Sequence, residues 1–211
     1  MGKNYYSIYI KSTKINLDKV ESFCQIKKWI KEYQNANKKQ KIKVLDVGCG
    51  IGYLTNYLNA DGIDKNVDAI NIAKKIYPNN KFIYGDIGSI QSLIESKYDI
   101  MVCYNIIEHL SDNLRIKFFN NTPKILKKDS LIILGYANPY HLVQIFWGFL
   151  TRKVLFDKTH IHNWTIRQFI KEVNRYFTIL EIKKTSPFTR FIFLGKYFKG
   201  DILLKCKVKN F

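Results

Sequence analysis

Residues 43–52 read Lys-Val-Leu-Asp-Val-Gly-Cys-Gly-Ile-Gly, and this stretch decides the fold. The apolar residues before the first glycine predict a short buried strand, and residues 53–58 predict a helix. Gly48, Gly50 and Gly52 stand between them at alternate positions. Because glycine has no side chain, such a loop lets the backbone approach a ligand, with the N–H groups of the helix start directed towards it. The stretch therefore predicts a ligand-binding loop rather than a plain turn.

The rest of the chain alternates between apolar runs and amphipathic stretches. Strands are predicted at 43–47, 61–64, 81–84, 98–104, 130–136, 178–182 and 201–208. Helices are predicted at 52–59, 66–77, 89–96 and 111–127, with Pro123 breaking the last, and another helix follows a cap at Thr165. The strands alternate with helices and lack a period of two, which predicts a parallel sheet covered on both faces. The fold class is therefore α/β.

A polar, partly helical extension at 1–40 precedes the predicted domain at 41–211. Apolar residues recur at helical spacing over 17–35, which predicts an amphipathic helix. A length of 211 residues suits one domain with a proper core. The first ten residues lack the apolar run of a signal peptide, and polar residues interrupt the apolar region 131–150, which excludes a membrane span there. The four scattered cysteines indicate reduced thiols and a cytoplasmic protein.

The formal net charge of +18 is the unusual global feature. A strongly basic chain can bind an anionic partner such as RNA, a phosphorylated sugar or a membrane surface. Most of the 35 basic residues are lysines, however, and they are spread along the whole chain. A surface built for phosphate more often clusters its charge and uses arginine, which makes bidentate contacts. The pattern favours a compositional bias over nucleic-acid binding, which stays open as an alternative.

An acidic residue near the glycines narrows the choice of ligand. Residues 46–52, Asp-Val-Gly-Cys-Gly-Ile-Gly, resemble the signature loop of class I S-adenosylmethionine-dependent methyltransferases. The dinucleotide fingerprint fits less well, since its third glycine would fall on Tyr53. The resemblance extends over about 40–182 and implies a Rossmann-like, seven-stranded, mostly parallel sheet with helices on both faces and an antiparallel last strand. It also implies S-adenosylmethionine as the cofactor, bound by Asp46, Gly48, Gly50 and Gly52.

Two further acidic residues follow at the ends of the next two strands. Asp64 and Lys65 end the second strand and are assigned to the cofactor, since a carboxylate there can accept hydrogen bonds from both ribose hydroxyls. The alternative role of Asp64 is to cap the following helix. Asp86 and Ile87 close the third strand, where the resemblance implies contacts with the adenine amine and ring. The alternative there is an ordinary turn at 85–86.

The fourth strand ends in Asn-Ile-Ile-Glu-His-Leu at 105–110. The Glu-His-Leu ending resembles the small-molecule branch of these enzymes, which includes the ubiquinone-biosynthesis methyltransferases. By that resemblance, the backbone around Asn105 meets the methionine end of the cofactor, and His109 lies near the transferred methyl group. A histidine with a pKa near neutral suits removal of a proton from a hydroxyl acceptor, so His109 is the candidate catalytic base. The alternative is that His109 packs against the loop or caps it.

Candidate acceptor-binding residues follow the fifth strand. Tyr140 and His141 lie in a segment at about 137–163 that is predicted to form a lid over the substrate. His160 and His162 alternate, so they point to the same side if the chain is extended there. Such a pair could bind a metal, but the sequence places no third ligand beside it, and no metal site is predicted. One of the two is instead expected to line the substrate pocket, and both are candidate acceptor-binding residues.

The predicted activity is methyl transfer from S-adenosylmethionine to a small molecule, at an oxygen of a sugar, glycan precursor or lipid-linked intermediate. One alternative acceptor is RNA, although the Asn/Asp-Pro-Pro-aromatic motif of nucleic-acid base methylases is absent after the fourth strand. A cofactor-binding subunit without catalysis also stays open, as does, with least support, a nicotinamide-dependent oxidoreductase. The aromatic and basic segment 191–199 is compatible with a lid or with a lipid-facing edge, and so with a peripheral membrane contact, while core packing of its phenylalanines stays open. The oligomeric state does not follow from the sequence.

Overall fold

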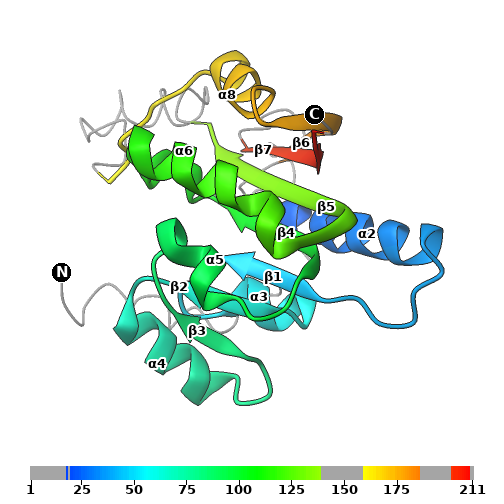
Figure 1. Ribbon diagram of the computed structural model, residues 1–211, viewed down its shortest axis with the longest axis vertical. Helices are drawn as coiled ribbons and strands as arrows, with labels where there is room; N and C mark the ends of the chain where they lie inside the picture. The colour runs from blue at the N-terminus through cyan, green and yellow to red at the C-terminus, as the bar shows by residue number, and fades with distance from the viewer. Residues whose placement is uncertain (1–17, 19, 139–158, 186–200, 210–211) are drawn as a thin grey trace.

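The computed structural model describes residues 18, 20–138, 159–185 and 201–209 (Figure 1). These residues form a seven-stranded sheet with the strand order β3-β2-β1-β4-β5-β7-β6. Its strands are β1 Val44–Val47, β2 Asp61–Asp64, β3 Phe82–Tyr84, β4 Tyr98–Tyr104, β5 Leu126–Ala137, β6 Phe177–Thr185 and β7 Asp201–Val208. The first five strands pair in parallel, whereas β7 is antiparallel to both β5 and β6. The prediction of a Rossmann-like, mostly parallel sheet with an antiparallel last strand is confirmed.

Side chains of the central strands alternate between two buried faces. In β4, Met101 and Cys103 belong to one core cluster, and Ile100 and Val102 belong to the other. Residues of β5 and β7 divide in the same way. Because both faces of these strands are covered, each strand reads as a continuous apolar run. This burial explains why sequence patterns alone locate the central strands.

Helices cover both faces of the sheet (Figure 1). One core cluster joins the sheet to α5 Ile90–Leu93, α6 Asp112–Asn121 and α8 Ile166–Val173, and the other joins it to α2 Glu21–Ala36 and α3 Tyr53–Leu58. The remaining described α-helix, α4 Val67–Ile76, packs beside β2 and β3. The prediction of helices on both faces is confirmed. Within the described ranges, no helix is both long and apolar enough to cross a bilayer.

The helix predicted at 17–35 corresponds to α2. Its buried residues Ile26 and Trp29 share a cluster with Val44 of β1 and Leu203 of β7. The indole N–H of Trp29 also donates to the carboxylate of Glu181 in β6 at 2.9 Å. The amino-terminal helix and the sheet therefore bury one common core.

The predicted break of the helix at Pro123 is confirmed, but the predicted bounds of the elements on either side of it are wrong. The helix predicted at 111–127 ends at Asn121, and Thr122–Ile125 forms a 3₁₀ helix with proline in its first turn. Strand β5 then begins at Leu126 rather than at 130. Proline has no N–H and its ring obstructs the preceding turn, so it can begin a helix but cannot continue one. The helix predicted at 89–96 also has other bounds. A 3₁₀ helix covers Ile87–Ser89, and α5 ends at Leu93.

Several residues predicted to meet the acceptor lie outside the described residues. They include Tyr140, His141 and most of the lid predicted at 137–163. The segment 191–199, which is compatible with a lid or a lipid-facing edge, also lies outside the described residues. His160 and His162 are described, and the elements around them fix where each one lies.

Candidate functional site

A cavity of about 350 Å³ opens at the carboxyl ends of β1, β2 and β4. The strand order changes direction between β1 and β4, because β2 and β3 lie on one side of β1 and the later strands lie on the other. Open α/β sheets bind their ligands at such a point. The described residues that line the cavity are Phe23, Asp46, Gly48, Cys49, Gly50, Ile51, Tyr53, Leu54, Asp64, Tyr104, Asn105, Ile106 and His109.

The three glycines of the loop face different surroundings. All have positive φ, at +74° for Gly48, +53° for Gly50 and +84° for Gly52. A Cβ added to Gly48 would lie 2.3 Å from the Ile106 side chain, and one added to Gly52 would lie 2.7 Å from Phe82. A Cβ added to Gly50 would meet no atom within 4 Å. Packing inside the protein therefore requires Gly48 and Gly52, whereas Gly50 leaves its backbone open to the cavity.

The carboxylate of Asp64 links the end of β2 to the glycine loop. One oxygen accepts a hydrogen bond from the N–H of Gly50 and the other accepts one from the N–H of Asn66, both at 2.8 Å. The side-chain cap of α4 is Asn66 rather than Asp64, because Asn66 accepts from the N–H of Ala69 at 3.1 Å. An ionised carboxylate offers about four acceptor positions, so Asp64 can accept two further donors from the cavity.

Asp46 lies in β1 beneath the glycine loop. It is 2% exposed, and the hydroxyl of Thr55 donates to its Oδ2 at 2.7 Å. Burial raises the pKa of Asp46 to about 7, and the nearby charge of Asp64 acts in the same direction, while the hydrogen bond from Thr55 opposes both. The carboxyl group of Asp46 therefore titrates near neutral pH.

The exit of β4 brings a second backbone turn to the cavity. Asn105 has φ of +55°, a left-handed conformation that asparagine adopts more readily than most residues. Its N–H donates to the carbonyl of Gly135 at 3.1 Å. Its side-chain Oδ1 is buried and accepts no hydrogen bond from the described part of the chain. A buried acceptor in a cavity wall suits a donor on a bound ligand.

His109 lies in the cavity wall just after β4. Its Nδ1 is 3.1 Å from the carbonyl oxygen of Thr159. A carbonyl can only accept, so the neutral ring carries its proton on Nδ1 and keeps the lone pair on Nε2. The ring also meets His160 edge-on, with the two ring centroids 4.7 Å apart. Nε2 of His109 can therefore accept a proton or bind a cation.

Four residues predicted to bind the cofactor are not among the described lining residues: Gly52, Lys65, Asp86 and Ile87. Lys65 is exposed. Asp86 is exposed too, and its carboxylate caps the 3₁₀ helix Ile87–Ser89 by accepting from the N–H of Gly88 at 2.7 Å. Ile87 is buried in the core. Asp86 is therefore the cap of the 3₁₀ helix that follows it, and its contact with adenine stays a prediction.

Comparison with known proteins agrees with this fold and cavity. The family described as methyltransferase domain matches residues 38–183, which is more than half of the chain. The chain belongs to this methyltransferase family. The resemblance seen in the glycine loop is thereby confirmed, and S-adenosylmethionine is the cofactor of the class that this loop resembles.

Two curated relatives match parts of the methyltransferase. "Putative methyltransferase 235L" of Invertebrate iridescent virus 6 is 41% identical over 68 residues, which cover 29% of this chain and 25% of the viral protein. The mitochondrial ubiquinone biosynthesis O-methyltransferase of Saccharomyces cerevisiae is 33% identical over 86 residues, which cover 36% of this chain and 28% of the yeast protein. The matched stretch thus spans less than a third of either relative.

A solved structure shares the fold over nearly the whole chain. It is an S-adenosylmethionine-dependent methyltransferase from Clostridium acetobutylicum, with a TM-score of 0.66 and 15% sequence identity. The superposition covers 98% of this chain and 97% of that chain. The backbone arrangement is therefore shared where the sequences have diverged.

The cavity of the methyltransferase has groups that fit S-adenosylmethionine. Gly50 leaves space where a side chain would otherwise stand, so the loop backbone can contact a ligand. Asp64 keeps acceptor positions that match two hydroxyl groups. The unsatisfied Oδ1 of Asn105 matches an ammonium donor, such as the one at the methionine end. These three residues lie on the lining of one cavity.

Three potential metal ligands also meet beside this cavity. Glu108, His109 and His160 each bring one donor atom, and these atoms all lie within 4.8 Å of one another. Glu108 is fully buried, and the two histidines are half-buried. Two imidazoles with one carboxylate form a donor set that divalent transition metals accept. The sequence pairs His160 with His162, whereas the fold brings His160 to the exit of β4.

His162 has different neighbours from His160. Its Nε2 is 2.9 Å from the guanidinium of Arg115, whereas His160 packs on His109. The chain bends at Ile161, so the alternation of an extended segment does not apply here. The extended conformation on which a shared side depended is therefore absent, and the roles of the two histidines towards the acceptor stay predictions.

Two aromatic residues of the cavity wall escaped the sequence analysis. Phe23 of α2 and Tyr104 at the end of β4 both line the cavity, with ring centroids 5.6 Å apart. The helical spacing identifies Phe23 as part of an apolar stripe, but it does not show which element the stripe faces. Tyr104 reads as one more residue of a buried strand. Neither position carries a local signal for a cavity.

Replacement of Asp46 by asparagine tests its raised pKa. The folded-state pKa of about 7 exceeds the ordinary carboxyl value of about 4, so the folded state holds the proton more tightly than the unfolded state. The titration of Asp46 therefore leaves the free energy of unfolding unchanged below about pH 4 and lowers it as the pH rises from there to about 7. Urea denaturation without cofactor measures this effect. Between pH 5 and pH 8, we expect the free energy of unfolding of the wild type to fall by about 2 kcal/mol more than that of Asp46→Asn. Parallel pH dependence of the two proteins would contradict the raised pKa.

Proposed function

We propose that this methyltransferase transfers the methyl group of S-adenosylmethionine to an oxygen atom of a small molecule. The observation that carries the proposal is His109, whose ring lines the same cavity as the glycine loop and keeps a lone pair on Nε2. Relatives named as ubiquinone biosynthesis O-methyltransferases support an oxygen acceptor. Within this class we favour a sugar, a glycan precursor or a lipid-linked intermediate, and a cytoplasmic location belongs to the same proposal.

Residues on one side of the cavity bind the cofactor, and residues on the other side act on the acceptor. When bound, S-adenosylmethionine supplies an electrophilic methyl group on a positively charged sulfur. The backbone at Gly50 and the carboxylate of Asp64 hold the nucleoside, and Asn105 accepts from the ammonium group. On the other side, Nε2 of His109 removes the proton from the acceptor hydroxyl, while the carbonyl of Thr159 fixes the ring through Nδ1–H. The chain otherwise acts by alignment and exclusion of water.

The acceptor is expected beside His109 and His160, because a base must lie within hydrogen-bond reach of the proton that it removes. Tyr140 and His141 keep their predicted contacts with the acceptor, and residues 137–163 keep their predicted role as a lid. His162 supports this region from behind, since its ring is held by Arg115.

Asp64 is assigned to the ribose hydroxyls of the cofactor. We expect Asp64→Ala to weaken binding of S-adenosylmethionine by about 1.5–3 kcal/mol, which is the scale of hydrogen bonds to a charged group. Isothermal titration calorimetry measures this loss. Because Asp64 also accepts from the N–H of Gly50, part of the loss could come from the loop. A 2′-deoxy analogue of S-adenosylhomocysteine separates the two effects, because it lacks one of the hydroxyl groups assigned to Asp64. Asp64→Ala should therefore weaken the binding of this analogue less than it weakens the binding of S-adenosylmethionine. Equal losses for both ligands would contradict the ribose contact.

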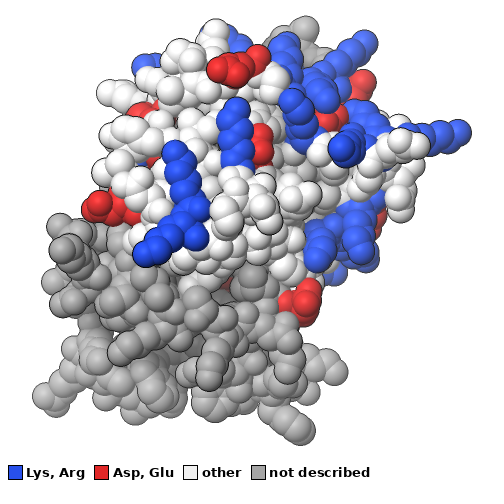
Figure 2. All heavy atoms as spheres, turned by 90° about the horizontal axis from the view of Figure 1, so that it is seen from below, with Lys and Arg blue, Asp and Glu red and all other residues white. Residues whose placement is uncertain are grey.

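The surface charge supports a small acceptor over RNA. On the face drawn in Figure 2, lysine and arginine side chains stand in several separate groups, and acidic side chains lie among them. A footprint for a nucleic-acid backbone is more often a continuous basic patch or stripe. On the described part of this face, the basic side chains are thus distributed rather than concentrated in one patch.

Transfer of a labelled methyl group tests the proposed function. The purified chain is incubated with methyl-tritiated S-adenosylmethionine and with an extract of the source cells, separated into polar, lipid and RNA pools. Label in the polar or lipid pool supports the proposal, and label in the RNA pool supports the RNA alternative. Binding of the cofactor without label in any pool would favour a subunit that binds it without catalysis.

A further inference from the structure

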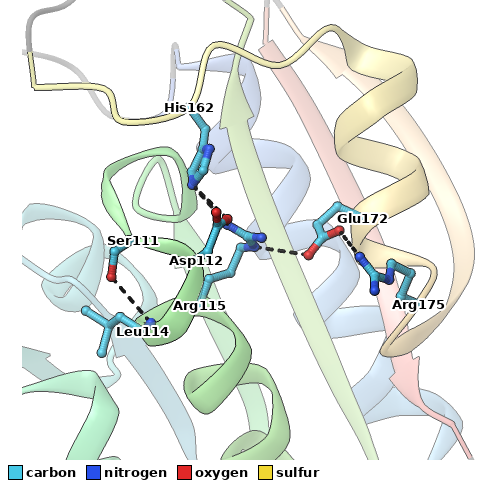
Figure 3. Close-up of polar contacts among 7 residues, drawn as sticks. All are labelled: Ser111, Asp112, Leu114, Arg115, His162, Glu172 and Arg175. Carbon is cyan, nitrogen blue, oxygen red and sulfur yellow. Dashed lines mark hydrogen bonds and ion pairs between the residues drawn. The ribbon is translucent and has the colours of Figure 1, made fainter.

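Arg115 is a buried cation that the proposed chemistry does not use. It belongs to α6 and is 6% exposed. Its Nε donates to Oε1 of Glu172 in α8 at 3.1 Å, and its Nη1 lies 2.6 Å from Oδ1 of Asp112 (Figure 3). Two carboxylates therefore surround one guanidinium and offset the free-energy cost of removing its charge from water.

The same guanidinium also holds residues 159–164, which we call the histidine segment. Nη1 of Arg115 lies 2.9 Å from Nε2 of His162, and Figure 3 shows this ring directed towards Asp112 and Arg115. Arginine can only donate, so Nε2 of His162 is the acceptor in this contact, and Oδ1 of Asp112 lies 3.4 Å from the same nitrogen. The guanidinium lies 5.0 Å from the ring centroid of Trp164, and His162 stacks on Trp164 with centroids 4.4 Å apart. One buried arginine thus contacts two side chains of the histidine segment.

The opposite side of the histidine segment contacts the exit of β4. The N–H groups of Ile161 and His162 both donate to the carbonyl of Glu108, at 2.9 and 3.1 Å. The carbonyl of Thr159 is the partner of Nδ1 of His109 at 3.1 Å. A shift of the segment away from Arg115 would therefore move the carbonyl that keeps the proton on Nδ1 of His109. It would also move His160, which packs edge-on against the same ring.

We propose that Arg115 is a positioning residue that acts on His109 through the histidine segment. It holds His162 and Trp164, so that the carbonyl of Thr159 stays on Nδ1 of His109 and Nε2 stays free of a proton. Arg115 is not among the described residues that line the cavity, so its effect is indirect. The inference rests on the proposed function where it concerns turnover, but its effect on the proton of His109 can be measured without any acceptor.

The chain offers a matched control for removal of Arg115. Arg115→Met deletes the donors and keeps a long side chain. Arg175→Met is the control, because Arg175 contacts the same acid, Glu172, at 3.2 Å and is largely exposed. His162→Phe keeps an aromatic ring on Trp164 and deletes the acceptor for Arg115, so it decides the question if Arg115→Met does not fold.

Nitrogen-15 NMR of the imidazole rings is the primary measurement, and the chain has only four histidines to assign. At a pH where the ring is neutral, we expect His109 to carry its proton on Nδ1 in the wild type and in Arg175→Met. In Arg115→Met and His162→Phe, we expect a mixture of Nδ1–H and Nε2–H forms. Once an acceptor is available, we expect kcat to fall about tenfold or more in these two variants, because small displacements of a catalytic group reduce turnover strongly. The Kd of the cofactor should change less than about twofold in the same variants, because Arg115 does not line its cavity.

Three results would decide between the positioning role of Arg115 and the catalytic role of His109. If His109 keeps its wild-type proton position in the folded variants of Arg115 and His162, the positioning role is overturned. If the proton moves and kcat stays at the wild-type value, the positioning role stands and the proposed catalytic role of His109 fails. A change of equal size in Arg175→Met would also overturn the proposal, because the effect would then come from Glu172.

Discussion

A leucine at position 50 is expected to abolish binding of S-adenosylmethionine and to leave the protein folded. A Cβ at Gly50 meets no atom within 4 Å, so the new side chain would extend into the cavity where the ligand has to lie. The φ of +53° adds a strain of about 1–2 kcal/mol for a residue with a side chain, which a domain of this size tolerates. We expect the affinity measured by calorimetry to fall at least about a hundredfold, which corresponds to about 2.7 kcal/mol.

Two more substitutions in the loop are the controls for Gly50→Leu. Asparagine has a smaller side chain than leucine, and it adopts positive φ more readily than most residues. The Gly50→Asn protein should therefore bind the cofactor with an affinity between those of the wild type and Gly50→Leu. Gly48→Leu would collide with Ile106 inside the protein, so it should lower the free energy of unfolding more than Gly50→Leu does. Wild-type affinity in a folded Gly50→Leu protein would contradict the placement of the cofactor against this loop.

Replacement of His109 is expected to have the largest effect on turnover. A general base contributes about 10²–10⁴-fold to a rate, so we expect kcat of His109→Ala to fall by a factor in this range. The Kd of S-adenosylmethionine should change little, because the glycine loop and Asp64 carry the assigned contacts with the nucleoside. A single-turnover assay with the labelled cofactor measures the chemical step directly.

Asparagine at position 109 separates catalysis from packing. Its side-chain amide can reproduce the hydrogen bond from Nδ1 to the carbonyl of Thr159, but it has no basic nitrogen in place of Nε2. If His109 is the base, His109→Asn should be as inactive as His109→Ala. Recovery of turnover in His109→Asn would show that the residue acts by packing or capping, which is the alternative that the sequence left open.

The central strands were predictable because burial on both faces leaves a direct mark on the sequence. β1 and β4 read as short apolar runs, and the glycine loop after β1 fixes where α3 begins. The start of β5 carries no such mark. Its residues 127–129 are charged and exposed, and Lys127 extends to Asp99 at 2.8 Å, so this part of the strand resembles a loop. Local pattern fails where a strand begins outside the core.

The candidate site could be predicted only where residues that are neighbours in the sequence form it. The glycine loop could be recognised, but the difference between Gly50 and its two neighbours depends on Ile106 and Phe82, which come from distant elements. The proximity of His109 to His160 likewise joins distant parts of the chain, and it depends on hydrogen bonds between backbone groups. Arg115 reads as one more polar residue of a surface helix, although the fold buries it.

Calorimetric titration of the purified wild-type chain with S-adenosylmethionine tests the central claim most directly. The account predicts saturable binding of one molecule per chain, which the Gly50→Leu substitution removes and the Arg175→Met substitution leaves intact. An absence of binding to the folded wild-type protein would contradict the assignment of this cavity to the cofactor, and the roles proposed for Asp64, Asn105 and His109 would fail with it.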